Sequence, residues 1–79
     1  MKDLSARNQL RGTVTNVVID GVTAEVTIDV GNDQQITSVI TRNSVERLGL
    51  KTGSPAIAII KATDVLVGIA DDTADGGDA

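Results

Sequence analysis

The chain has 79 residues, a formal net charge of −4, and no cysteine, histidine or aromatic residue. Without Cys and His it lacks the usual ligands of zinc and similar cations, it cannot form a disulfide, and it lacks the base that activates a serine or cysteine nucleophile. Without Phe, Tyr and Trp it has no platform on which single-stranded bases stack. These absences weigh against an enzyme, a site for such metal cations and a nucleic-acid-binding domain.

The last nine residues differ in composition from the rest of the chain. Residues 71–79 contain four acids, two glycines and no apolar side chain larger than alanine, so they cannot bury enough surface to offset the entropy of ordering. We expect one domain over residues 1–70, followed by a disordered acidic tail over residues 71–79. The domain holds seven bases and seven acids, and this near-neutral charge is compatible with binding an anion.

The chain shows no membrane or export signal. Its first residues are polar, and no apolar run approaches the length of a membrane span. We therefore expect a cytoplasmic protein without membrane contact.

The first half of the chain predicts a three-stranded meander. Residues 9–19 are rich in β-branched side chains, with Gly12 as a bend or bulge. Asp20-Gly21 is a two-residue hairpin signal, residues 22–30 alternate between apolar and polar, and residues 34–40 form the third strand. In the first strand, one face is expected to carry Leu10, Val14 and Val18. In the second, the side chains expected to point inward are Val22, Ala24, Val26, Ile28 and Val30.

A short helix and two further strands are predicted after the meander. Thr41 or Asn43 can cap a helix that ends near Gly49. Residues 55–60 and 65–69 are then predicted as the fourth and fifth strands. Five strands with one short helix between the third and fourth is the order of an OB-like barrel. We therefore predict an all-β fold, a small five-stranded OB-like barrel.

The last two predicted strands favour self-association. They are apolar on both faces, whereas an antiparallel strand with one solvated face alternates. A domain of about 70 residues without disulfides or metals also gains little stability from its own core. A second copy of the chain is the simplest cover for these strands.

Three polar stretches lie at the ends of predicted strands, and their side chains mainly donate hydrogen bonds or carry positive charge. They are Ser5-Ala6-Arg7-Asn8, Thr41-Arg42-Asn43-Ser44 and Lys61-Ala62-Thr63. Each also has a plain structural interpretation: a solvated arm, a helix cap, and a lysine reaching from a sheet edge to water. Taken together, they form a donor set that suits a small oxyanion.

The three stretches, in this order and context, resemble the Mop family of molybdate- and tungstate-binding proteins (molbindins) over nearly all of residues 1–70. Ser-Ala-Arg-Asn followed by Leu-x-Gly-x-Val at residues 10–14 matches the family pattern unchanged. The family's Thr-x-x-Ser pair corresponds to Thr41 and Ser44. Its lysine followed by small hydroxyl or alanine residues corresponds to Lys61-Ala62-Thr63. Arg42 and Asn43 fall at variable positions of the pattern and receive no role.

The resemblance implies a single Mop (TOBE-type) domain that binds molybdate or tungstate at the subunit interfaces of a homohexamer built from three dimers, for intracellular molybdenum storage and homeostasis. The oxyanion-binding residues that it implies are Ser5, Arg7, Thr41, Ser44, Lys61, Ala62 and Thr63. Two alternatives remain open: a structural or interaction module without a ligand, and, with less support, a nucleic-acid-binding OB domain. No cofactor, no catalysis and no nucleic-acid partner is expected.

Overall fold

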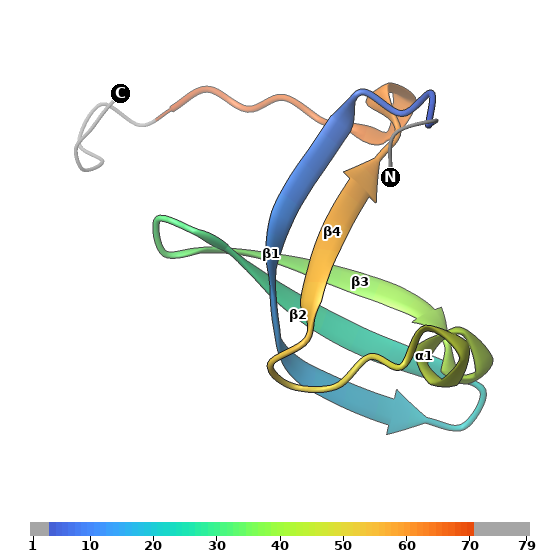
Figure 1. The fold of residues 1–79 in the computed structure, drawn as a ribbon. Helices are drawn as coiled ribbons and strands as arrows, with labels where there is room; N and C mark the ends of the chain where they lie inside the picture. The colour runs from blue at the N-terminus through green and yellow to red at the C-terminus, as the bar shows by residue number, and fades with distance from the viewer. Residues whose placement is uncertain (1–3, 71–79) are drawn as a thin grey trace.

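The computed structural model describes residues 4–70; the predicted acidic tail lies outside these residues. Four strands form one antiparallel sheet in the order β3-β2-β1-β4 (Figure 1). The elements, in chain order, are β1 (Asn8–Asp20), β2 (Thr23–Gly31), β3 (Gln34–Thr41), α1 (Arg42–Leu48), β4 (Pro55–Ile60) and the 3-10 turn η1 (Ala62–Asp64). The predicted all-β class, with a three-stranded meander and a short helix between the third and fourth strands, is confirmed.

Strand β1 belongs to two pairs at once. Its first half pairs with β4, from Asn8 opposite Ile60 to Thr13 opposite Pro55. Its second half pairs with β2 and ends with Asp20 opposite Thr23. Figure 1 shows β1 bending between these two partners, so that β4 crosses over the meander and the sheet curls.

Gly12 and a bulge after Val14 allow this bend. A Cβ atom on Gly12 would lie 2.3 Å from the backbone oxygen of Asp29, so only glycine lets β1 approach β2 so closely. The irregularity in the β1–β2 register lies slightly later, between Val14 and Asn16. This extra residue reverses the alternation of side chains. The predicted common face is therefore wrong, because Val14 is buried whereas Val18 beyond the bulge is 47% exposed.

The first hairpin turn lies one residue later than predicted. Asp20 pairs with Thr23, so the two turn residues are Gly21 and Val22, and Gly21 takes the positive φ of 64° that the turn requires. Val22 was expected to point inward, but it lies in the turn and is 80% exposed. The alternation within β2 is otherwise as predicted, because its buried residues are Ala24, Val26 and Ile28.

Helix α1 is defined by caps at both ends. The Ser44 N–H donates to the Thr41 hydroxyl at 3.0 Å, which makes Thr41 the N-cap rather than Asn43. Gly49 adopts a left-handed φ of 66° at the C-terminal end, and the Leu50 N–H donates to the Val45 carbonyl. Val45 is the helix residue buried against the sheet.

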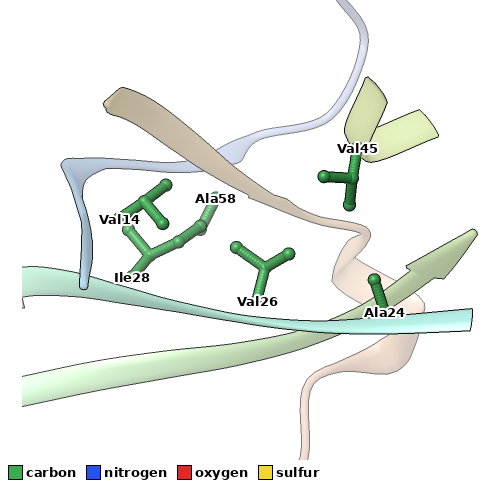
Figure 2. Packing of buried hydrophobic residues seen from close by; sticks show 6 residues of the cluster. All are labelled: Val14, Ala24, Val26, Ile28, Val45 and Ala58. Atoms are coloured by element: carbon green, nitrogen blue, oxygen red, sulfur yellow. The ribbon is translucent and has the colours of Figure 1, made fainter. Parts of the chain in front are cut away.

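The core is small and contains no side chain larger than isoleucine. Figure 2 shows its members gathered on the concave side of the sheet, with Val45 contributed by α1. They are Val14, Ala24, Val26, Ile28, Val45 and Ala58. Such a core supplies limited burial for the stability of a single chain.

The predicted fifth strand over residues 65–69 does not form in the described chain, and the sheet is open rather than a closed barrel. Residues 65–70 continue beyond η1 away from the sheet, as Figure 1 shows, and pair with none of the described strands. Leu66, Val67 and Ile69 are 95%, 92% and 99% exposed. A strand needs a neighbouring edge to satisfy its backbone groups, and the path of the chain after η1 brings this segment to none.

Replacing Gly12 by Ala tests the close approach of β1 to β2. The new methyl group would overlap the Asp29 backbone and the Ile28 side chain, so we expect the free energy of unfolding to fall by about 1–3 kcal/mol. Urea denaturation measures this change. Thr13→Ser, at an exposed neighbouring position, is the control and should stay within about 0.5 kcal/mol of the parent. Equal stability of Gly12→Ala and the parent would contradict the role assigned to this contact.

Candidate functional site

Two of the three polar stretches meet at one end of the β1–β4 pair. Because Asn8 lies opposite Ile60, the arm that precedes β1 and the turn that follows β4 leave the sheet side by side (Figure 1). Between them is an open hollow of about 520 Å³. Its lining residues are Leu4, Ser5, Ala6, Arg7, Ile59, Lys61, Ala62 and Thr63. Five of the seven predicted site residues therefore share one hollow.

The hollow carries positive charge and hydrogen-bond donors. Among the described residues, its lining includes two cations, Arg7 and Lys61, and no carboxylate. Neither cation forms an ion pair within residues 4–70, where the single recorded pair lies on helix α1. Ser5 and Thr63 add hydroxyl groups, which can donate to an acceptor-only ligand.

The turn after β4 has a definite local structure. The Asp64 N–H donates to the Lys61 carbonyl at 2.9 Å, and the Val65 N–H donates to the Ala62 carbonyl at 3.3 Å. These bonds close η1 directly beside the hollow. They hold Ala62 and Thr63 in a compact turn, whereas the arm opposite has no regular secondary structure.

Thr41 and Ser44 lie elsewhere, at the start of α1. The Thr41 hydroxyl donates to Ser44 Oγ at 2.8 Å, and Arg47 Nη2 donates to the same oxygen at 3.4 Å. Thr41 borders a second hollow of about 490 Å³. The lining there includes Arg42, whose charge is balanced by Glu46 at 3.4 Å.

Within one chain the predicted site is therefore divided. Ser5, Arg7 and the 61–63 turn line one hollow. Thr41 and Ser44 lie at the start of α1, which Figure 1 places well away from η1. Helix capping accounts for the local bonds of Thr41 and Ser44.

Sequence reasoning missed the apolar lining of the hollow. Leu4 and Ile59 both border it, and Ile59 does so because it pairs with Gln9 across β1 and β4. Only the register between two strands that are distant in sequence reveals this position. Leu4 carries no recognisable signal, since a single leucine in a polar arm has many interpretations.

The chemistry of the hollow suits an anion rather than a metal cation. Within the described residues no three His, Cys, Asp or Glu side chains come close enough together to hold a metal ion. The described lining, with two cations, two hydroxyls and no carboxylate, instead favours a ligand that only accepts hydrogen bonds.

No helix over residues 4–70 has the length and apolar character needed to cross a membrane.

Comparison with known proteins gives a consistent family. The TOBE domain family matches residues 4–67. Molybdenum-pterin-binding protein 1 of Clostridium pasteurianum is 45% identical over 64 residues, which cover 81% of this chain and 94% of that protein.

Two solved structures share the fold closely. MopII from Clostridium pasteurianum superposes with a TM-score of 0.80 at 43% identity, over 85% of this chain and all of that chain. The cytoplasmic molybdate-binding protein ModG, solved with molybdate bound, gives 0.81 at 46% identity over 85% of this chain and 48% of its own. The sequence match to the family over residues 4–67 thus spans the whole sheet and helix α1.

Replacing Thr41 by Ala tests the helix cap without any ligand. The Ser44 N–H would lose its acceptor, so we expect the free energy of unfolding to fall by about 1 kcal/mol. Asn43→Ala is the matched control on the same helix and should change stability by less than about 0.5 kcal/mol. Thermal and urea unfolding measure both. A larger loss for Asn43→Ala than for Thr41→Ala would reverse the assignment of the cap.

Proposed function

Since this chain belongs to the TOBE domain family, as a single small domain of the Mop kind, we propose that it binds molybdate. The observation that carries the proposal is the hollow between the arm and η1, where Arg7 and Lys61 lie among hydroxyl donors and no carboxylate of residues 4–70 belongs to the lining. The relatives support the same ligand, because the structure of ModG contains bound molybdate. Tungstate, a tetrahedral dianion of nearly the same size, is proposed as an equivalent ligand.

The donor set matches the chemistry of a tetrahedral dianion. All four oxygens of molybdate accept hydrogen bonds, and a bond to a charged acceptor contributes about 1.5–3 kcal/mol. The guanidinium of Arg7 can offer two parallel N–H donors, while Lys61 supplies a compact charge on the other wall. Ser5 and Thr63 can orient their hydroxyls toward the remaining oxygens. This is a binding function without a catalytic step.

We propose that the complete site forms between copies of the chain. The hollow of about 520 Å³ is far larger than a four-oxygen anion, since one water molecule occupies about 30 Å³ in the liquid. Because the hollow is also open to solvent, one chain alone would leave part of the ligand uncovered. Thr41 and Ser44 of a second copy are the proposed donors for the open side.

The apolar surface supports self-association. An open groove of about 500 Å³ runs between the concave face of the sheet and the loop after α1. Its lining is almost entirely apolar: Val26, Ile28, Ser38, Ile40, Leu48, Leu50, Pro55, Ala56, Ile57 and Ile59. The exposed segment 65–70 has matching apolar character. We propose that this segment of one copy covers the groove of another, where it forms the fifth strand.

The proposed assembly is a homohexamer of three dimers, and the proposed role is storage and buffering of molybdate in the cytoplasm. The description of ModG as cytoplasmic supports this location. A ligand-free interaction module is the second candidate, because the exposed apolar segment alone accounts for an assembly. Native mass spectrometry with and without molybdate separates the two, since it reports the number of chains and of bound anions together.

Replacing Arg7 by Ala tests the binding site. Loss of a two-pronged charged contact should cost about 2–4 kcal/mol of binding free energy, which is a fall in affinity of at least about 25-fold. Titration calorimetry with molybdate measures this after each variant is shown to assemble. Two exposed cations outside the hollow, Arg11 and Lys51, provide the control substitutions to Ala, which should bind nearly as the parent does.

Two outcomes would count against the proposal in different ways. Equal affinities for Arg7→Ala and the parent would overturn the site assignment. A parent protein that assembles but takes up no molybdate would overturn the function and favour the interaction module.

Two truncations test the assembly. Removing residues 71–79 should leave the assembly and the anion affinity nearly unchanged, because this acidic segment has no large apolar side chain to bury. Removing residues 65–79 should yield monomers, since the proposed cover of the groove is lost. Sedimentation velocity at micromolar concentration reports both results. A stable folded monomer of the full chain would contradict self-association, and a hexamer without residues 65–79 would contradict the role of this segment.

A further inference from the structure

One side-chain hydrogen bond within residues 4–70 holds the arm that carries Ser5 and Arg7. Residues 4–7 form no helix or strand. Among the hydrogen bonds of residues 4–70 that lie outside regular elements, this arm takes part in one, from Gln9 Nε2 to the Ala6 carbonyl at 3.0 Å. Ala6 lies between the two side chains proposed to bind the anion. A bond to its carbonyl therefore restricts the backbone on both sides of it.

Gln9 itself is held by the sheet. It is the second residue of β1 and lies opposite Ile59 of β4, whose side chain borders the hollow. The amide of Gln9 thus ties an arm without helix or strand to strand β1 beside the hollow. Side chains that fix the binding conformation in advance raise affinity by reducing the entropy lost when the ligand binds.

We propose that Gln9 is a positioning residue of the oxyanion site, which acts by holding the arm so that Ser5 and Arg7 face Lys61. The proposal rests on the proposed function for the identity of the ligand. Gln9 does not itself border the hollow. Its contribution is the bond from its amide to Ala6, and it differs from Arg7 in that it adds no charge.

A purely structural role predicts something different. The bond between Gln9 and Ala6 is exposed and spans three residues, so its loss should hardly alter the unfolding of the domain. If Gln9 positions the arm, anion affinity falls while the stability of the free protein stays constant. If Gln9 only supports the fold, anion affinity and the stability of the free protein fall together.

The substitution Gln9→Met removes the donor and keeps the length of the side chain. In the full chain we expect molybdate affinity to fall by about three- to tenfold in titration calorimetry, with the thermal midpoint of the anion-free protein unchanged. Gln35→Met is the matched control, because Gln35 is an exposed glutamine on β3 with no recorded side-chain bond within residues 4–70. It should leave the affinity unchanged. A Gln9→Met protein that binds as tightly as the parent would overturn the proposal.

A double-mutant cycle shows whether Gln9 acts through the arm. In the Arg7→Ala background, Gln9→Met should lower molybdate affinity by a smaller factor, because the arm no longer carries its main contact with the anion. In the Lys61→Ala background, Gln9→Met should lower molybdate affinity by the same factor as in the parent, since Lys61 belongs to the opposite wall of the hollow. Equal losses in both backgrounds would contradict action through Arg7.

A measurement without anion separates this proposal from the proposed function. Nitrogen-15 relaxation of the free protein should show larger fast motions at residues 5–7 in Gln9→Met than in the parent and in Gln35→Met. Unchanged motions would overturn the positioning role even if the parent binds molybdate. If the parent binds no molybdate, the proposed function fails, and the motions of the arm still decide whether Gln9 holds it.

Discussion

Strand β1 pairs with β4 along its first half and with β2 along its second, and these halves meet where Gly12 lies against the backbone of Asp29. Any side chain at position 12 would push β1 away from β2. The curl of the sheet follows from this contact, and so does the concave side that holds the core. The position of the hollow follows as well, because β4 can bring residues 61–63 to the arm only if it pairs with the start of β1.

Local patterns predicted those parts of the fold that depend on local interactions. Alternation identified β2 and its buried face, and the cap residues placed α1 correctly. The bulge after Val14 was not visible, because an extra residue in a strand depends on its partner's register and leaves no mark of its own. The same reason explains Val18, which has the composition of a core residue and lies on the exposed side of the bulge.

The composition of the candidate site was easier to predict than its geometry. Short polar stretches at strand ends indicate possible hydrogen-bond donors whatever the tertiary arrangement of the strands. Arg7 and Lys61 could therefore be chosen from the sequence. Their approach to one another depends on the pairing of Asn8 with Ile60, a contact between opposite ends of the domain. The separation of Thr41 from this hollow, and the apolar contribution of Ile59, likewise depend on tertiary structure. The apolar pattern of residues 65–69 could not decide whether they form a fifth strand, since apolar residues do not specify which sheet edge they will pair with.

The long-range pairing of β1 with β4 has a consequence for the order of folding. The two hairpins of the meander close short loops, whereas Asn8 can meet Ile60 only after nearly the whole described chain has been brought together. Contacts between residues so distant in sequence form at a large loss of chain entropy and tend to slow folding. We therefore expect the arm and η1 to come together late in the folding of the domain. During synthesis, a ribosome-bound chain whose residues 55–63 are still inside the exit tunnel lacks one wall of this hollow, so the hollow can form only after these residues have been released.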